Sequence, residues 1–356
     1  MHVVPDPARF GRAVNATTAP DAPRHLRKDS DLSAAEVEKL LSLARTVKAA
    51  GRTGLAPHLA GRLIALLFEK PSTRTRAAFE TAAYALGAQC TYIDPASSHL
   101  GDSESVEDTG RVLGRYYDAI AFRGFAQGSV ETLANHAGVP VWNALTDTWH
   151  PTQALADLLT IEEHHDPAGP PARVCFAGDG RDNVVHSLLV SGAMRGMDLR
   201  IACPGSLSPE PGIVAIAQER AAQSGGRILI TEDVGDAIRD ADFVYADVWL
   251  SMGEDRGAWE DRIRLLRPYR VDRPLLERSG NPGVRFLHCL PSTHDRRSAL
   301  GDQLFRLTGL EGMEVSDEVF RSSASLVFDQ AENRRHTIAA VMLHSLAEGA
   351  PGIEER

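Results

Sequence analysis

The chain has 356 residues, a formal net charge of −10 and a charged fraction of 24%. This length suits two medium-sized domains better than one. The acidic balance argues against a nucleic-acid partner, which usually needs a basic protein face. No apolar run is long enough to cross a bilayer, and the first twenty residues lack the apolar core of a signal peptide. We therefore expect neither a nucleic acid nor a membrane among its partners.

The cysteines are widely separated and include no CxxC pair. Their spacing predicts neither a structural zinc site nor a disulfide framework. A reduced, cytoplasmic compartment is the expected location. The four residues are Cys90, Cys175, Cys203 and Cys289.

The N-terminal region divides into a predicted tail and a predicted helix. Residues 1–30 carry Pro, Asp, Thr and Asn without hydrophobic periodicity, so we expect a mobile tail. Ser33 and Glu36 have the spacing of a capping box at a helix start. An apolar stripe over 40–47 follows, and Gly51 is a typical terminator.

Strand-like and helical patterns then alternate along the chain. Short apolar runs typical of strands lie at 62–68, 89–93, 118–122, 139–143, 173–177, 198–202, 227–230, 242–246 and 284–288. Helical patterns lie at 75–86, 105–116, 128–136, 151–163 and 325–348, and Pro151 suits the first turn of its helix.

This alternation predicts an α/β fold with two doubly wound parallel-sheet domains joined by a linking helix. We expect the first domain at 31–150, together with a C-terminal helix at 325–349, and the second at 151–324. Polar clusters follow most of the predicted strands. Because ligands of open parallel sheets bind beyond the carboxyl ends of strands, we expect the site in a cleft between the domains.

The segment Ser72-Thr73-Arg74-Thr75-Arg76 lies between a predicted strand and a predicted helix. Hydroxyls, free backbone N–H groups at a helix N-terminus and arginine forks all bind phosphate. The alternative is a capping residue followed by solvated arginines. Arg123 ends another predicted strand, although a lone arginine at such a place is more often a surface residue.

His150 and Gln153 open the predicted linking helix. A neutral imidazole and an amide at this position can donate hydrogen bonds to a carbonyl oxygen. The alternative for His150 is a capping or core histidine. Gly178 to Asn183 forms a glycine-rich turn without the third glycine of a dinucleotide-binding loop, so it more plausibly presents Asn183 at a helix start.

Two further clusters follow strands of the second domain. Asp247 can hold an amino group and Asn183 a carboxylate, a combination that suits an α-amino acid. Ser251 and Met252 lie just beyond Asp247, where core packing is the alternative for the methionine. Cys289 ends the last predicted strand, where a small buried hydrophobe is the alternative.

Four motifs together resemble the ornithine carbamoyltransferases of the aspartate/ornithine carbamoyltransferase family. They are FEKPSTRTR (68–76), HPTQALADLL (150–159), DVWLSMGE (247–254) and HCLP (288–291). The resemblance extends from about residue 31 to 349 and includes 103–115 and 328–337. In this order the motifs are highly specific, and the SMG segment separates the group from aspartate and putrescine carbamoyltransferases.

The resemblance implies transfer of the carbamoyl group of carbamoyl phosphate to the side-chain amine of L-ornithine, giving L-citrulline and phosphate. It also implies that the C-terminal helix packs back on the first domain. No metal or organic cofactor is required, and a homotrimer or a multiple of it is expected, with the loop near 97–105 reaching a neighbour's site. Whether the pathway is biosynthetic, catabolic or specialised stays open.

The family pattern assigns roles by matching position. Carbamoyl phosphate would be held by Ser72, Thr73, Arg74, Thr75, Arg123, His150, Gln153, Cys289, the backbone of Leu290, and Arg334. Ornithine would be held by Asn183, Asp247, Ser251 and Met252. The catalytic residues would be Cys289, Asp247, Arg123 and His150.

The chain departs from the family pattern at His99, Asp102, Asp182 and Ser292. The first two could alter affinity for carbamoyl phosphate. A function of another class is an anion-binding regulatory protein that has lost catalysis. Every position that the chemistry needs is present, which argues against that alternative.

Overall fold

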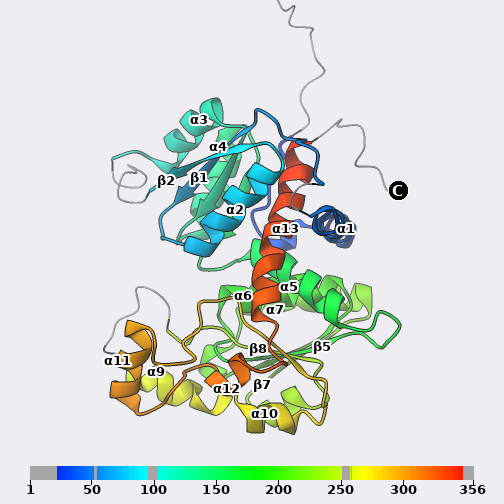
Figure 1. The fold of residues 1–356 in the computed structure, drawn as a ribbon, viewed down its shortest axis with the longest axis vertical. Helices are drawn as coiled ribbons and strands as arrows, with labels where there is room; N and C mark the ends of the chain where they lie inside the picture. Colours follow the sequence, from blue (N-terminus) through cyan, green and yellow to red (C-terminus); the bar gives the residue numbers. More distant parts are fainter. Residues whose placement is uncertain (1–21, 52–53, 95–102, 251–256, 258, 348–356) are drawn as a thin grey trace, which may run out of the picture.

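The computed structural model describes residues 22–51, 54–94, 103–250, 257 and 259–347, which form two α/β units (Figure 1). The first contains a parallel four-stranded sheet in the order β2-β1-β3-β4. The second contains a parallel five-stranded sheet in the order β7-β6-β5-β8-β9. The predicted fold class is confirmed.

The strands, and the helices for which the sequence predicts a range, lie close to the predicted ranges; the helices α6 to α12 of the second unit had no predicted range. The first unit contains β1 (Leu63–Phe68), α2 (Thr73–Ala85), β2 (Gln89–Ile93), α3 (Val106–Tyr116), β3 (Ala119–Arg123), α4 (Gln127–Ala137) and β4 (Val141–Leu145). The second contains β5 (Arg173–Ala177), α6 (Asn183–Met194), β6 (Asp198–Ala202), α7 (Pro211–Ser224), β7 (Arg227–Thr231), α8 (Val234–Ile238), β8 (Phe243–Tyr245), α9 (Trp259–Leu266), α10 (Arg273–Arg278), β9 (Arg285–Leu287), α11 (Ala299–Thr308) and α12 (Asp317–Phe320).

In each sheet the strand order reverses once, and this reversal places the site. The chain leaves β1 towards β2 and returns to β3 on the other side of β1; β6 and β8 flank β5 in the same way. Ligands of open parallel sheets bind beyond the strand ends at such a reversal. In the first sheet Phe68 pairs with Arg123 there, and in the second Phe176 pairs with Tyr245.

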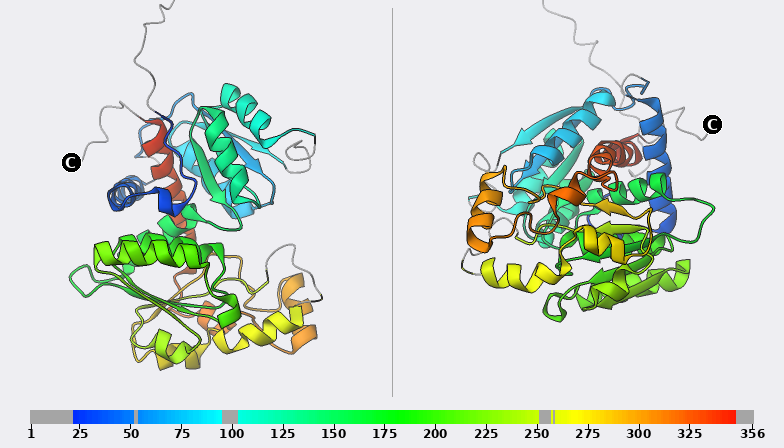
Figure 2. Two further views of the ribbon diagram at one scale, coloured as in Figure 1. Left: turned by 180° about the vertical axis from the view of Figure 1, so that it is seen from behind. Right: turned by 60° about the horizontal axis from the view of Figure 1, so that its bottom comes forward.

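Two long helices connect the units. α5 (Pro151–His164) is buried from Pro151 to Ile161, and a proline opens it as predicted. α13 (Val327–Leu346) contacts β9 of the second unit and then packs on α5, α1 (Ala34–Ala50) and α2. Figure 2 shows α13 passing from the second unit into the first, so the predicted packing of the C-terminal helix is confirmed. Among the described helices, none has both the length and the apolar character needed to span a membrane.

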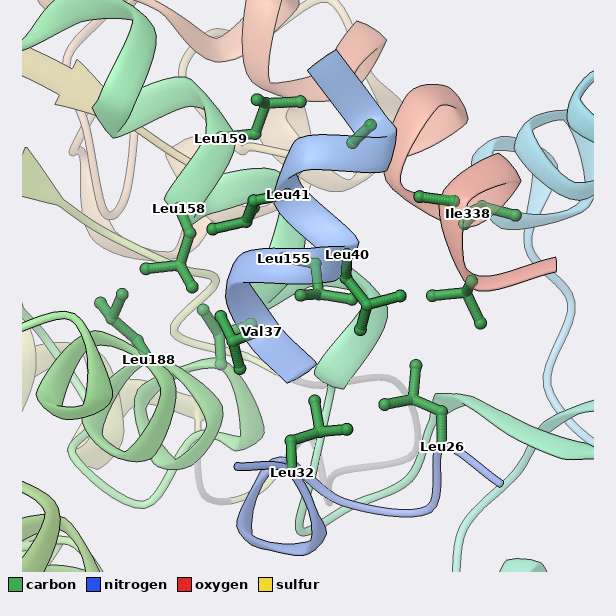
Figure 3. Close-up of a cluster of buried hydrophobic side chains, with 14 of the residues drawn as sticks. Leu26, Leu32, Val37, Leu40, Leu41, Leu155, Leu158, Leu159, Leu188 and Ile338 are labelled. Carbon is green, nitrogen blue, oxygen red and sulfur yellow. The ribbon is translucent and has the colours of Figure 1, made fainter. Parts of the chain in front are cut away.

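The apolar core is continuous across the boundary between the units (Figure 3). Side chains from the N-terminal segment, α1, α5, α6 and α13 pack together in it. They include Leu26, Leu32, Val37, Leu40, Leu41, Leu155, Leu158, Leu159, Leu188 and Ile338. Each fully buried leucine contributes about 1.5–3 kcal/mol. The linking helix α5 is therefore packed on several sides. The strand ends of both sheets are supported by the same apolar core.

The N-terminal helix confirms its predicted signals, whereas the predicted tail needs a correction. Ser33 and Glu36 form the capping box of α1, and Gly51 ends the helix with φ 68°. Residues 22–30 are not a tail: the Leu26 N–H donates to the Val141 carbonyl at 2.9 Å, and the Leu26 carbonyl accepts from the Asn143 N–H at 2.7 Å. Backbone pairing of this kind needs no hydrophobic periodicity. Residues 1–21 lie outside the described residues.

Candidate active site

The N-terminus of α2 forms one end of the site. Ser72 is the N-cap residue, and its hydroxyl accepts a hydrogen bond from the Thr75 N–H at 3.3 Å. The other N–H groups of the first turn have no intrahelical partner and lie at the positive end of the helix dipole. Thr73 and Arg74 are exposed beside them. Ser72 can therefore cap α2 while the remaining N–H groups of the first turn bind an anion.

Two buried arginines from distant elements converge on the hydroxyl of Thr75. Arg123 donates to it through Nη1 at 3.4 Å and Arg334 of α13 through Nη2 at 3.1 Å. The two side chains are nearly inaccessible, and the Nε of each lacks a hydrogen-bond partner among the described residues. Buried charges are normally paired. This cluster can therefore bind an anion.

The pKa shifts of Arg74, Arg123 and Arg334 also favour the binding of an anion. Burial, with the nearby charge of Arg334, lowers the pKa of Arg123 to about 10. Burial also lowers the pKa of Arg74 and that of Arg334. Arg123 and Arg334 are held together in a poorly solvated place, where they are also repelled by the nearby charge of Arg74. A doubly charged anion such as a phosphate group would relieve this repulsion.

His150 lies beside the arginines as the N-cap residue of α5. Its backbone N–H donates to the hydroxyl of Ser187 on α6 at 2.8 Å. Burial, followed by the charges of Arg334 and Arg123, lowers the pKa of the imidazole well below its ordinary value. The ring is therefore neutral at pH 7 and can donate one N–H to a carbonyl oxygen.

Gln153, one turn along α5, has one free polar atom. Its Nε2 donates to Asp157 at 2.7 Å, and its buried Oε1 has no partner among the described residues. Asp157 also accepts from Gln330 of α13 at 2.6 Å and from Tyr245 of β8 at 3.2 Å. This buried network fixes the amide so that Oε1 can accept a hydrogen bond from a substrate N–H. The HPTQALADLL pattern contained Asp157, but its role required the contact with α13.

Asp247 and Cys289 meet at the strand ends of the second sheet. The Cys289 thiol donates to Asp247 Oδ1 at 3.1 Å. Burial, followed by the charge of Asp247, raises the pKa of the thiol well above its ordinary value. Cys289 is therefore a protonated donor rather than a thiolate nucleophile. The pair can orient a substrate group, and packing alone does not describe this cysteine.

Asp182 adds a second carboxyl that the sequence analysis did not assign to the site. As the N-cap residue of α6 it accepts from the Val184 N–H at 2.9 Å. Burial raises the pKa of Asp182 to about 6, and burial together with the charge of Asp182 raises the pKa of Asp247 well above its ordinary value. Two neighbouring carboxyls ionise together with difficulty, so an ammonium group is their natural partner.

Asn183 opens α6, as the glycine-turn interpretation predicts. Its amide donates to the Thr146 carbonyl, beyond the end of β4, at 2.7 Å. One of its two amide hydrogens is thus used to join the units. The other is left for a ligand, since an amide carries two donors.

A buried glutamate, Glu314, supports the HCLP turn (288–291) through hydrogen bonds. His288 accepts from the Leu290 N–H at Nδ1, at 2.9 Å, so its Nε2 carries the hydrogen and donates to Glu314 at 3.2 Å. Ser292 also donates to Glu314, at 2.8 Å, which gives this departure from the family pattern a structural role. Leu290 has φ 57°, and the turn directs Cys289 towards Asp247. Glu314 lies beyond α11, and no local sequence signal indicates its role.

The two halves of the site face each other. Asp247 and Cys289 of the second unit lie close enough to Arg74 of the first unit to raise its pKa, against the lowering effect of burial. Cationic groups from the first unit and acidic groups from the second therefore lie near one another. The predicted ornithine contacts Ser251 and Met252 lie outside the described residues, as do His99 and Asp102.

Two clusters of side chains have atoms of the kinds that ligate a metal ion, and the glycine turn at 178–183 is the feature to test for a dinucleotide. Asp247, His288 and Cys289 present ligand-type atoms within 4.8 Å of one another, and so do His294, Asp295 and Asp317. In the glycine turn, Asp179 is paired with Arg181 and Arg262.

Comparison with known proteins gives a consistent result for both units. Residues 24–163 match the model of the aspartate/ornithine carbamoyltransferase carbamoyl-P binding domain, and residues 172–345 match that of the Asp/Orn binding domain. An ornithine carbamoyltransferase from Pyrococcus furiosus is 39% identical, with a TM-score of 0.81 over 90% of this chain and 96% of that one.

Two further solved structures are similar over the same extent. An ornithine carbamoyltransferase from Thermus thermophilus is 37% identical, with a TM-score of 0.75 over 91% of this chain and 99% of that one. An anabolic ornithine carbamoyltransferase from Campylobacter jejuni is 31% identical, with a TM-score of 0.80 over 90% and 98% of the two chains.

Proposed function

The chain belongs to the aspartate/ornithine carbamoyltransferase family and is a carbamoyltransferase, and on this premise we propose that its acceptor is L-ornithine. It would transfer the carbamoyl group of carbamoyl phosphate to the side-chain amine, giving L-citrulline and phosphate. The observation that carries the proposal is the facing arrangement of the Arg74, Arg123 and Arg334 cluster and the Asp247–Cys289 pair.

Carbamoyl phosphate fits the first half of the site. The N-terminus of α2 and the three arginines would hold its phosphate. The neutral imidazole of His150 and the guanidinium of Arg123 would donate to the carbonyl oxygen, which gains negative charge when the amine attacks. The free Oε1 of Gln153 and the Leu290 carbonyl would accept from the carbamoyl amide.

The acceptor amine must be neutral before it attacks. With a pKa near ~10.4, neutralising an alkyl ammonium at pH 7.4 costs roughly 4 kcal/mol. Desolvation in the closed site lowers this cost. Asp247 and the Cys289 thiol would orient the amine, the new C–N bond would form as the C–O bond to phosphate breaks, and the departing phosphate would accept the amine proton.

The acidic character of the second half favours ornithine over other acceptors. Aspartate would bring two carboxylates towards Asp182 and Asp247. Putrescine has no carboxylate for the amide of Asn183. Ornithine offers an α-ammonium to the acidic pair and an α-carboxylate to Asn183, which suits both.

A turnover assay tests the proposal directly. The full-length protein is incubated with carbamoyl phosphate and, in parallel, with ornithine, putrescine, N-acetylornithine or aspartate, and the carbamoylated product is measured. Ornithine should give the highest kcat/KM. Comparable kcat/KM for putrescine would contradict the choice of acceptor, and no product with any amine would favour the anion-binding regulatory protein instead.

We also propose that the protein assembles as a trimer or a multiple of it, as the family resemblance implies. Light scattering on the active protein measures this. A stable, fully active monomer would contradict it.

A further inference from the structure

Gln330 of α13 is a buried amide to which the mechanism above gives no role. Its side chain is fully inaccessible to solvent. Its Oε1 accepts a hydrogen bond from the His288 backbone N–H at 2.8 Å, and its Nε2 donates to Asp157 at 2.6 Å and to the Tyr245 hydroxyl at 3.0 Å. Because a backbone N–H can only donate, the orientation of the amide is determined. Both hydrogens and the oxygen of the amide are thus in use.

One side of Gln330 leads to Gln153 on α5. Asp157 Oδ1 accepts from Gln330 at 2.6 Å and from Gln153 Nε2 at 2.7 Å. Burial raises the pKa of Asp157 to about 6, against the effect of these hydrogen bonds, so the carboxylate is charged at pH 8 and is a strong acceptor. With its Nε2 held in this way, Gln153 directs Oε1 away from Asp157, and that buried oxygen has no partner among the described residues.

The other side of Gln330 leads to Leu290 in the HCLP turn. His288, whose backbone donates to Gln330, accepts from the Leu290 N–H at 2.9 Å through Nδ1. The Leu290 carbonyl oxygen lies 3.7 Å from Cys289 Sγ, so it stands beside the thiol. Gln330 therefore fixes the start of the turn, and with it the place of the Leu290 carbonyl.

Gln153 Oε1 and the Leu290 carbonyl come from different parts of the fold, the linking helix and the second unit. In the proposed reaction, both accept from one group, the NH2 of the carbamoyl moiety. The two hydrogens of an amide NH2 lie in one plane at a fixed angle, so two acceptors must stand at a matching spacing. Gln330 has direct hydrogen bonds to the supports of both acceptors, which are Asp157 and His288.

We propose that Gln330 is a positioning residue that determines specificity for the carbamoyl group: it holds Gln153 Oε1 and the Leu290 carbonyl at the spacing that an NH2 group requires. This inference rests on the proposed function, from which it takes carbamoyl phosphate as the donor substrate. The alternative is that Gln330 only attaches α13 to the second unit. The two roles predict different behaviour towards an acyl phosphate that has no NH2 group.

Acetyl phosphate is such a ligand. It has the phosphate and the carbonyl of carbamoyl phosphate, with a methyl group in place of the NH2. A buried acceptor that faces a methyl group has neither a hydrogen bond nor water, so a site that binds an NH2 group rejects the methyl analogue. The wild type should therefore bind carbamoyl phosphate at least about tenfold more tightly than acetyl phosphate. Inorganic phosphate, as a third ligand, reports on the arginine cluster alone.

Three single variants of the full-length chain test the proposal. Gln330→Met removes the amide at nearly the same side-chain length. Asp157→Asn keeps an acceptor oxygen for both glutamines but removes its charge. Asn333→Ala is the matched control, because Asn333 is another buried amide of α13 that donates to α5, at Thr160 (2.9 Å) and Glu163 (2.8 Å). Calorimetry at pH 8 gives the dissociation constants of the three ligands, and thermal unfolding gives the melting temperature.

In Gln330→Met the dissociation constant of carbamoyl phosphate should rise by about tenfold, the effect of losing about one hydrogen bond. The dissociation constants of acetyl phosphate and inorganic phosphate should stay within about twofold of the wild type. Asp157→Asn should change the ratio of the two acyl phosphate constants in the same direction, by about threefold. Asn333→Ala should leave this ratio unchanged, even where its melting temperature falls. A purely structural role for Gln330 predicts no change in the ratio.

An unchanged ratio in Gln330→Met would overturn the proposal, and so would an equal change of the ratio in Asn333→Ala. If Gln330→Met does not fold, Asp157→Asn decides by the same measurement. A wild type that binds both acyl phosphates equally would reject the two NH2 acceptors and the proposal with them. Failure of ornithine as the acceptor would appear only in the turnover assay, so the two failures are distinguishable.

Discussion

The two sheet edges that form the site carry groups of opposite type, basic at the first and acidic at the second, and burial shifts the pKa values at both for the same physical reason. At the first, Arg123 and Arg334 are buried, and burial lowers their pKa values. At the second, Asp247 and Cys289 are held in a similar environment, and burial raises theirs. In both places desolvation disfavours the charged form that the group would adopt in water.

The difference indicates what each edge binds. A cluster of cations is stabilised by an anion, and a pair of carboxyls by a cation. Each half of the site is thus complementary to one substrate of the proposed reaction. Neither half matches both substrates, so binding of the two is expected to depend on different residues.

The largest effect is expected from Asp247→Asn, which removes the centre of the acidic half. The variant should lower kcat/KM for ornithine by about a hundredfold or more, since losing one partner of a buried charge pair costs about 3–5 kcal/mol. The dissociation constant of carbamoyl phosphate should change little. Steady-state kinetics and calorimetry measure the two quantities, and an equal loss in both would show that the halves do not act separately.

Arg74→Ala tests the cationic half. It should weaken carbamoyl phosphate binding by about tenfold or more, because a hydrogen bond to a charged group contributes about 1.5–3 kcal/mol. The fold should be intact, since Arg74 is exposed. Arg76→Ala is a control from the same helix, because its guanidinium pairs with Glu80 instead. An unchanged dissociation constant in Arg74→Ala would make it a surface residue.

Cys289→Ser asks whether the thiol orients the amine or only packs. The substitution is nearly isosteric, so packing alone predicts near-normal kinetics. An orienting role predicts a loss of about tenfold in kcat/KM for ornithine, corresponding to roughly one hydrogen bond. The melting temperature should change little. Full activity from pH 6 to pH 8 would leave the orientation of the amine to Asp247 alone.

The smallest effect is expected from Asp182→Asn, which leaves one carboxyl in the acidic half. Without the neighbouring charge, the pKa of Asp247 should fall, so Asp247 becomes charged at lower pH. The pH profile of kcat/KM for ornithine should lose an ionisation near pH 6, where Asp182 titrates. At pH 8 the variant should bind ornithine a few-fold more weakly, by about 1 kcal/mol. If the acid limb of the kcat/KM profile is unchanged in Asp182→Asn, Asp182 takes no part in binding the substrate cation.

Much of the fold could be predicted from the sequence because its signals are local. The capping box of Ser33 and Glu36, the proline that opens α5 and the alternation of apolar runs each depend on neighbouring residues. The strand-end rule then placed Arg123 and Asp247 at the correct edges without any contact information. The family motifs supplied Arg334, for which local reasoning offered nothing.

Other parts of the site depend on contacts between elements far apart in the chain. Asp157 is held by a residue of α13, and Glu314 accepts a hydrogen bond from His288, which precedes α11 in the chain. The error at residues 22–30 has the same origin, because a segment without periodicity became ordered by backbone pairing beside β4.

The sequence by itself determined most of the elements, the two-domain α/β architecture and the family, and it supplied the groups proposed to contact substrate. These follow from local propensity, periodicity and motifs, which are properties of short stretches of chain. Only the tertiary structure decided the protonation states of Asp247, Cys289 and His150, and the supports behind them. Both depend on desolvation and on charges brought together by folding, and a linear sequence contains neither distance nor burial.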